Sequence, residues 1–248
     1  MVKKLCCFFV LAFSLCAAFG ADSKWTFASY QTEFSSPSHL ITVSEWKFQF
    51  PGGSKMAEEK QLSGFSSKYY SVFKDEGGTE WIHFALDAGD KGHSKNTKYV
   101  RSELRHLENW DMKGFHRMSY TFKAFSDDKS AKFTVGQIHC VPDEKIMSGE
   151  HSPLLRIAVA DGKIRAWIKN YSDGSYKSPV LGAYSYGEEK SVGIETTENI
   201  LAIYMDGRKV FQEEVFCPFK NYFKIGVYPQ QTHGFFDVLI KDLKVEVK

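Results

Sequence analysis

Polar and apolar residues alternate along much of this chain, and turn signals interrupt the alternation at short intervals. In a β-strand successive side chains point to opposite faces, so a period of two is typical of a strand with one buried face. Two Asp-Gly turns are flanked by alternating segments and predict β-hairpins. They are Asp161-Gly162, between 154–160 and 163–168, and Asp206-Gly207, between 200–205 and 208–211.

The same pattern excludes most other fold classes. Helical periodicity is scarce, so a βαβ fold would lack its crossover helices. Phe, Tyr and Trp make up 15% of the chain, which favours strands around a large core. Residues 235–247 alternate weakly and predict a closing strand. We therefore expect an all-β protein, a two-sheet β-sandwich of jelly-roll type.

The first twenty residues predict export of the chain. Lys3 and Lys4 precede an apolar run over 5–19, and the small residues Ala18 and Gly20 follow the pattern of a signal-peptide cleavage site. A membrane anchor is the alternative, but a bilayer span needs about 20 apolar residues and this run is shorter. We expect a signal peptide at residues 1–20 and a secreted, extracellular protein.

The predicted mature chain, residues 21–248, is short enough to form a single domain. Loss of Lys3 and Lys4 reduces the 32 basic residues to 30, which equals the 30 acidic residues. A chain without net charge has no long-range field for a polyanion, so an acidic partner must be held by local clusters of charge. No basic stripe suggests nucleic acid binding. We expect a monomer that contacts no membrane after signal cleavage.

Two cysteines remain in the mature chain, Cys140 and Cys217. In an oxidising compartment they could form one disulfide, while two free buried thiols are the alternative.

Three distant segments, 99–105, 136–139 and 222–230, place polar side chains on one face and apolar side chains on the other. If these strands are neighbours, one sheet face carries the side chains that can grip a carboxylate and move a proton beside it. The polar positions are Tyr99, Arg101, Glu103, Arg105, Gln137, His139, Tyr222, Lys224, Tyr228 and Gln230.

The three segments resemble, in the same order, the three signature blocks of polysaccharide lyase family 7, the alginate lyases. The matching residues are Arg101-Ser102-Glu103-Leu104-Arg105, Gln137-Ile138-His139 and Tyr222-Phe223-Lys224-Ile225-Gly226-Val227-Tyr228-Pro229-Gln230. The third block departs from the family pattern at Ile225 and Pro229, which puts sugar contacts more in question than chemistry. The resemblance implies a jelly roll with a concave, groove-forming sheet, and cleavage of an acidic polysaccharide, alginate.

The resemblance implies that Arg101, Gln137, His139 and Tyr228 form the catalytic set. A uronate carries its carboxylate on C5, and removal of the C5 proton places charge onto that carboxylate, so cations and amide donors there lower the barrier. Arg101 and Gln137 suit this task, His139 can donate a hydrogen bond or act as base, and Tyr228 can protonate the leaving 4-oxygen.

Five further residues are expected to bind substrate: Glu103, Arg105, Lys224, Gln230 and Tyr222. Glu103 and Arg105 have an alternative role, the orientation of Arg101. Because the protein supplies the cations itself, we expect no metal and no other cofactor, and the remaining histidines show no metal-ligand spacing.

The stereochemistry of the sugar separates two roles. In mannuronate the C5 hydrogen and O4 lie on the same side, so Tyr228 could be both base and acid. In guluronate they lie on opposite sides, so His139 would take the proton and Tyr228 would give one. In the family, Ile at the centre of the Gln-x-His block accompanies activity on guluronate, so Ile138 implies a weak preference for guluronate-containing stretches.

Other functions fit parts of the pattern. A non-catalytic, lectin-like uronan-binding module would keep the fold and the groove without needing Tyr228 beside His139. A lyase acting on another polyuronate, such as a glucuronan, would keep all of these residues. A glycoside hydrolase would need two positioned carboxylates, and no segment pairs two carboxylates at alternate positions as 99–105 pairs its charges.

Overall fold

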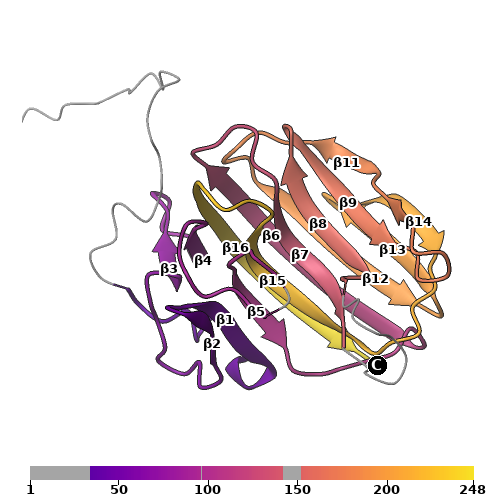
Figure 1. Cartoon of the computed structure of the whole chain (residues 1–248), viewed down its shortest axis with the longest axis horizontal. Helices are drawn as coiled ribbons and strands as arrows, with labels where there is room; N and C mark the ends of the chain where they lie inside the picture. Colours follow the sequence, from indigo (N-terminus) through magenta and orange to yellow (C-terminus); the bar gives the residue numbers. More distant parts are fainter. Residues whose placement is uncertain (1–33, 96, 142–151) are drawn as a thin grey trace, which may run out of the picture.

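The structure, a computed structural model, describes residues 34–95, 97–141 and 152–248. These residues form two antiparallel β-sheets, which confirms the predicted two-sheet sandwich of jelly-roll type (Figure 1). The described part has no α-helix and one short 3-10 helix, η2 (Val43–Glu45). Among the described residues, no helix has the length and apolar character needed to cross a membrane. The predicted signal peptide, residues 1–20, lies outside the described residues.

Among the described residues, the front sheet has nine strands in the order β10-β9-β8-β7-β15-β5-β1-β2, with β11 paired to β9. Their bounds are β1 (Trp46–Gly52), β2 (Lys55–Glu59), β5 (Ser102–His106), β7 (Phe133–Cys140), β8 (Leu155–Ala160), β9 (Lys163–Lys169), β10 (Tyr176–Lys177), β11 (Val180–Ala183) and β15 (Asn221–Pro229).

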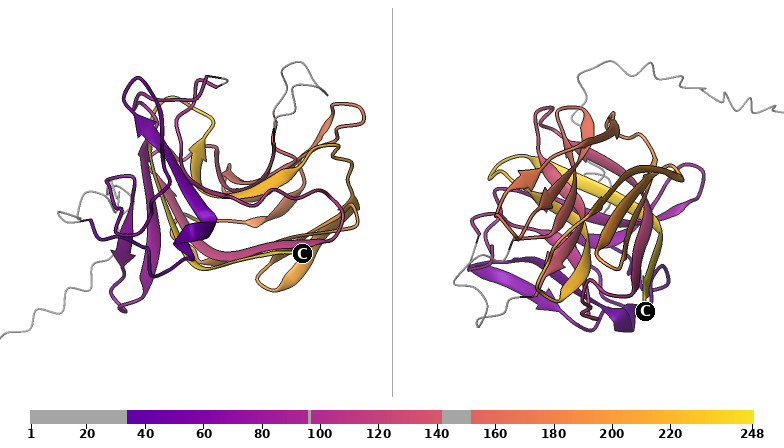
Figure 2. Two further views of the ribbon diagram at one scale, coloured as in Figure 1. Left: turned by 90° about the horizontal axis from the view of Figure 1, so that it is seen from below. Right: turned by 90° about the vertical axis from the view of Figure 1, so that its right-hand side faces the viewer.

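The back sheet, in the part of the chain that the structure describes, has seven strands in the order β14-β13-β12-β6-β16-β4-β3. They are β3 (Tyr70–Lys74), β4 (Glu80–Asp87), β6 (Phe115–Ser126), β12 (Lys190–Thr197), β13 (Ile200–Met205), β14 (Arg208–Glu214) and β16 (Phe235–Val247). Figure 2 shows that both layers of the sandwich are curved.

The core lies between the sheets and is built by the apolar half of each alternating strand. Phe223, Ile225 and Val227 on β15 are fully buried, as is Ile138 on β7. Full burial of such a side chain contributes roughly 1.5–3 kcal/mol. The layers meet through aromatic pairs such as Phe133 and Phe236, whose ring centroids lie 5.2 Å apart. Because these residues face inward, their polar neighbours in sequence face outward.

The two Asp-Gly hairpins form as predicted. Asp161 and Gly162 have φ angles of 51° and 66° and join β8 to β9. Asp206 and Gly207 have φ angles of 49° and 77° and join β13 to β14. Positive φ at both central residues is the geometry of a type I′ turn, which favours Asp followed by Gly.

Gly226 on β15 allows a close approach of two central strands. Its φ is 139°, and a Cβ at this position would lie 2.3 Å from the carbonyl oxygen of Ser102 on β5. The pairing of β15 with β7 shifts register between Ile225 and Tyr228. Tyr228 therefore lies opposite Thr134 on β7, and Gly226, two residues before Tyr228, lets β5 pack against the same stretch.

Candidate active site

The strand order brings the three polar segments side by side. β15 lies between β7 and β5, so the middle and third segments pair along one edge and the first pairs along the other (Figure 1). Lys224 lies opposite both Gln137 on β7 and Arg105 on β5. Tyr222 lies opposite His139. Directly opposite residues share a face of the sheet, so these polar side chains meet on the outer face of the front sheet.

A buried polar network forms the floor of this face. Glu103, Gln137 and Lys224 are each 1% exposed. The Glu103 carboxylate accepts a hydrogen bond from Gln137 Nε2 on one oxygen and from Lys224 Nζ on the other. Arg101 Nη1 lies 3.6 Å from Glu103 Oε2. One carboxylate thus fixes the amide group and two cations, because a buried charge must keep its partners.

Burial also changes the acidity of the network. It lowers the pKa of Lys224 to about 7, since the ammonium loses water, and the positive charges of Arg101 and Arg105 act in the same direction. The Glu103 carboxylate opposes this shift. The charge on Lys224 therefore changes near neutral pH.

Tyr228 and Arg101 lie in contact above the floor. Arg101 Cζ is 4.6 Å from the centroid of the Tyr228 ring, within the range of a cation–π interaction. The Tyr228 hydroxyl is hydrogen-bonded to Thr97 Oγ1 at 3.1 Å. Tyr99 packs its ring against Tyr228 edge to face, with centroids 6.3 Å apart. Tyr228 is half-buried, so its phenol is fixed yet reaches solvent.

His139 and Tyr222 form a second pair on this face. Their rings stack with centroids 5.3 Å apart, and the Tyr222 hydroxyl lies 3.2 Å from His139 Nδ1. His139 Nδ1 also donates to the carbonyl oxygen of Cys140 at 2.9 Å. A neutral ring with its proton on Nδ1 carries a lone pair on Nε2, as a general base requires. Burial raises the pKa of Tyr222 to about 12, so this phenol keeps its proton.

Arg105 holds Tyr222 in place from the other side. Its Cζ lies 4.0 Å from the centroid of the Tyr222 ring. Its guanidinium donates to the carbonyl oxygens of His106 and Leu107 and to Asn109 Oδ1, at 2.8, 3.0 and 2.7 Å. These bonds occupy much of the guanidinium, and so its geometry suits positioning of Tyr222 more than a sugar contact.

Gln230 supports Tyr228 from the end of β15. Its Nε2 donates to Thr134 Oγ1 at 3.1 Å and to the carbonyl oxygen of Tyr228 at 2.6 Å, while its Oε1 is buried without a partner among the described residues. The structure therefore brings all nine predicted site residues onto one face. Their substrate contacts stay predictions.

Sequence patterns did not single out Thr97, the hydrogen-bond partner of Tyr228. It precedes β5 and carries no alternation signal of its own. The sequence shows only that Thr97 has a hydroxyl group and lies two residues before Tyr99. Threonine is common in loops, so this position alone does not indicate a role in the site.

Cys140 and Cys217 are both buried and lie side by side beneath His139. Their Sγ atoms are 3.5 Å apart and unbridged in this structure. The disulfide stays a prediction. Within residues 34–95, 97–141 and 152–248, no three His, Cys, Asp or Glu side chains form a group that could hold a metal ion.

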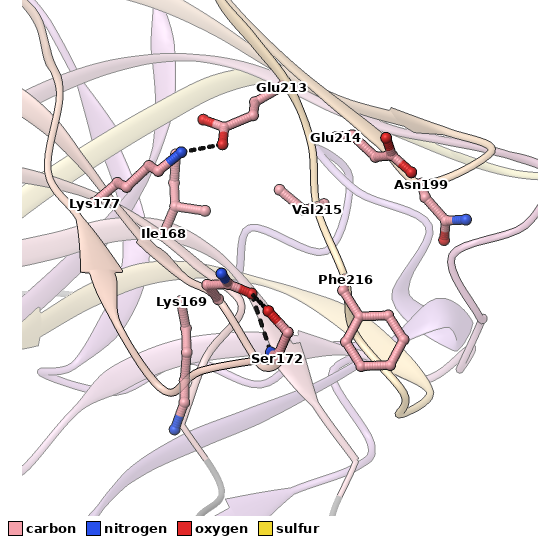
Figure 3. Close-up of a pocket in the computed structure, with 10 residues that line it drawn as sticks. Ile168, Lys169, Ser172, Lys177, Asn199, Glu213, Glu214, Val215 and Phe216 are labelled. Atoms are coloured by element: carbon pink, nitrogen blue, oxygen red, sulfur yellow. Dashed lines mark hydrogen bonds and ion pairs between the residues drawn. The ribbon is translucent and has the colours of Figure 1, made fainter.

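A pocket of about 270 Å³ lies elsewhere, between the end of β9 and the segment that follows β14 (Figure 3). Lys177 and Glu213 form an ion pair across it, and Phe216 lies at its edge. None of the described residues that line it belongs to the predicted site. Its described lining holds two lysines and two glutamates, so it has no excess of positive charge to attract a polyanion.

Comparison with known proteins agrees with this geometry. Residues 41–247 match the family model described as alginate lyase. The 1.0 Å crystal structure of alginate lyase A1-II′, a member of polysaccharide lyase family 7, has a TM-score of 0.73 and 26% identity, and the match covers 85% of this chain and 97% of that chain. A tyrosine-to-phenylalanine variant of that enzyme in complex with product (GGG) has a TM-score of 0.74 and 25% identity, covering 86% and 99%.

An alginate lyase from Pseudomonas aeruginosa, at 20% identity, shares the fold with a TM-score of 0.71 over 83% of this chain and 99% of that chain. No curated protein matches the sequence. The family match spans the three polar segments and both sheets. The chain therefore belongs to the alginate lyase family and is a polysaccharide lyase.

Proposed function

We propose that this polysaccharide lyase cleaves alginate by β-elimination. A base takes the C5 proton, the electron pair forms a C4=C5 double bond, and the 4-oxygen leaves with a proton from an acid. No water is consumed, and the new chain end is an unsaturated uronate. The observation that carries this proposal is the contact between Tyr228 and Arg101 on the face that holds Gln137 and His139.

The first requirement is to neutralise the carboxylate at C5. Arg101 presents a guanidinium beside Tyr228, and Gln137 has an amide whose orientation Glu103 fixes. One N–H of that amide binds Glu103, which leaves the second for a substrate oxygen. Charge-assisted hydrogen bonds of this kind favour the dianionic intermediate over the ground state.

The second requirement is an acid at O4 and a base at C5. Tyr228 supplies the acid, held by Thr97 and Arg101. His139 supplies the base for guluronate, where the C5 hydrogen and O4 lie on opposite sides, and Tyr228 takes both roles for mannuronate. A weak preference for guluronate-containing stretches follows from the family resemblance at Ile138. That side chain is fully buried in the core, so any effect on specificity passes through its neighbours Gln137 and His139.

Replacement of the proposed acid tests the mechanism. Tyr228→Phe keeps the ring against Arg101 but removes the hydroxyl, so formation of the unsaturated product should fall by at least about 10²-fold. The measurement is ultraviolet absorbance of the double bond, with alginate binding followed separately by calorimetry. Tyr204→Phe, on the back sheet, is the matched control and should keep full activity. Normal turnover by Tyr228→Phe would remove this residue from the mechanism.

A lectin-like module is the competing function, because it would use the same groove without chemistry. Wild-type protein that binds alginate and yields no unsaturated product would favour it. A parallel screen over polymannuronate, polyguluronate, mixed alginate and glucuronan separates alginate lyase activity from activity on another polyuronate. Mass spectrometry of the products adds a direct check, since elimination adds no water to the cleaved chain.

We also propose that the protein is secreted and acts as a monomer outside the cell. Lys3, Lys4 and the apolar run over 5–19 support export, as does a polymeric substrate too large to enter a cell.

A further inference from the structure

A group of cations lies on the outer face of the front sheet, next to the catalytic set and outside the three polar segments. Arg156 on β8 lies directly opposite Gln137 on β7, and Trp167 on β9 lies directly opposite Arg156. The row Lys224, Gln137, Arg156, Trp167 therefore crosses four neighbouring strands. Since neighbouring strands are about 4.8 Å apart, Trp167 stands roughly 10 Å from Gln137.

Two more cations join this row. Lys132, just before β7, places its Nζ 4.0 Å from the centroid of the Trp167 ring. Arg165 lies on the same strand and the same face as Trp167, and its Nη1 reaches the carbonyl oxygen of Ser178 at 3.4 Å. All four side chains are half-buried, so they are held in place and still accessible.

The cluster has too few acids to balance its charge. The Arg156 side chain makes no hydrogen bond or ion pair with any described residue, and the Lys132 ammonium makes no ion pair with one. Burial lowers the pKa of Lys132, and the charges of Arg156 and Arg165 lower it further, while the exposed Asp161 opposes them. Like charges packed together are unfavourable without an anion between them, so this arrangement is suited to a bound anion.

We propose that Lys132, Arg156 and Arg165, with Trp167, form a second uronate subsite, which binds the carboxylate of a neighbouring sugar on the same polymer chain. The subsite rests on the proposed function, because it assumes that the polymer lies across Gln137. Trp167 acts as a positioning residue that holds the Lys132 ammonium through its ring. Arg156 lies one strand from Gln137, and Trp167 lies two strands from it. These separations are comparable with the length of one or two sugar units.

Removal of single charges tests the subsite. Arg156→Gln and Lys132→Gln should each raise KM for polymeric alginate roughly 5- to 10-fold, the loss expected for one charge-assisted contact, and change kcat less than about twofold. The increase should shrink in concentrated NaCl, which screens the wild-type attraction. Arg156→Lys keeps the charge and should restore most of the affinity. Arg208→Gln, at the start of β14 on the back sheet, removes an equal charge elsewhere and should leave KM unchanged.

Trp167→Ala and Trp167→Phe test whether the Trp167 side chain acts through the face of its aromatic ring or only by filling space. The alanine variant should raise KM as much as Lys132→Gln does, and the two changes together should add little, because both act through the same ammonium. The phenylalanine variant keeps a ring face and should recover part of the loss. Full additivity in the double variant would remove the positioning role of Trp167.

Calorimetric binding of polymeric alginate to the Tyr228→Phe protein, with and without Arg156→Gln, distinguishes failure of the subsite from failure of the lyase proposal. Weakened binding in a protein whose wild type cleaves no alginate would support the subsite and reject the lyase mechanism. Unchanged binding and unchanged KM for both Arg156→Gln and Lys132→Gln, with the fold intact by circular dichroism, would overturn the subsite while leaving the mechanism in place.

Discussion

The role proposed for His139 depends on which of its two ring nitrogens carries the proton. The carbonyl oxygen of Cys140 accepts from Nδ1, so the lone pair of the neutral ring is on Nε2. Tyr222 stacks on the ring and Arg105 lies on Tyr222, so two side chains from two neighbouring strands and one backbone carbonyl fix the imidazole. This arrangement gives His139 a defined direction, which is useful only if a proton is taken from a specific face of the sugar.

Removal of this imidazole should therefore affect one substrate more than the other. His139→Gln should lower kcat/KM for polyguluronate by roughly 10²- to 10⁴-fold, and for polymannuronate by much less, because Tyr228 can serve as both base and acid there. The measurement is initial rates on the two block polymers under one condition. His233→Gln, an exposed histidine, is the control. Equal losses on both polymers would show that His139 does not act as the guluronate base.

The pair Lys224 and Glu103 predicts a pH-dependent stability. The unfolded chain keeps the Lys224 proton up to its ordinary pKa of 10.5, and the folded chain releases it near 7, so the unfolded state binds more protons between these values. Stability from this group therefore rises with pH across that window. From pH 6 to pH 9, wild type should gain about 1–3 kcal/mol in free energy of unfolding relative to Glu103→Gln/Lys224→Gln, whose amides do not titrate. Parallel pH profiles in urea denaturation would contradict the shift.

At this scale, alternation predicted which face each side chain occupies but not its depth. Glu103 and Lys224 were expected to touch substrate, and they lie on the correct face at 1% exposure. Larger neighbours such as Tyr222 and Arg101 stand beside them on this face. A period of two carries no information about neighbours from other strands, because strand order is a tertiary property.

At the scale of elements, hairpins with strong turn signals were predictable and short edge strands were not. The strands around Asp161-Gly162 and Asp206-Gly207 begin and end within three residues of the predicted bounds, and 200–205 matches at both ends. β10 and β11, with two and four residues, are too short to show a period. The Arg156–Trp167 row was missed for another reason: the alternation predicts β8 and β9 as a hairpin, and only the pairing of β8 with β7 places that hairpin beside Gln137.

Gly226 allows β15 to approach β5 closely, and Tyr228 lies two residues further along the same strand. Gly226→Ala adds a Cβ that would meet backbone atoms of Ser102 and Glu103 at 2.3 and 2.8 Å, in a conformation that L residues avoid. We expect a loss of about 2–4 kcal/mol in stability and a displaced Tyr228. Thermal unfolding and lyase rates measure the two effects. Gly174→Ala, with φ 73° and no atom within 4 Å of its Cβ, isolates the backbone contribution and should cost about 1 kcal/mol with normal activity.

At the scale of the whole molecule, binding of a polyanion by a chain without predicted net charge depends on where its cations gather. Arg156, Arg165 and Lys132 lie on the outer face of the front sheet and form no ion pair with a described residue, whereas Arg101 beside them is paired with Glu103. On the back sheet, lysines such as Lys190 and Lys241 are paired with acids at 2.7 Å. A paired cation attracts an anion weakly and an unpaired one attracts it strongly. The fold therefore creates a polyanion site by separating paired from unpaired cations.

The predicted export and the predicted disulfide can be tested together, because Cys140 and Cys217 would be oxidised to a disulfide only in an oxidising compartment. Cys140 ends β7, Cys217 lies 77 residues further along, and their sulfur atoms need to approach from 3.5 Å to about 2.05 Å. Closure of so long a loop should stabilise the folded protein by about 2–4 kcal/mol. Protein exported to the bacterial periplasm should have the mass of residues 21–248 less two hydrogen atoms, and regain them on reduction with a lower melting temperature. The Cys140→Ala/Cys217→Ala variant should show no response to reductant. Full-length mass from the periplasm would contradict the signal peptide, and the correct mature mass with two free thiols would contradict the disulfide alone.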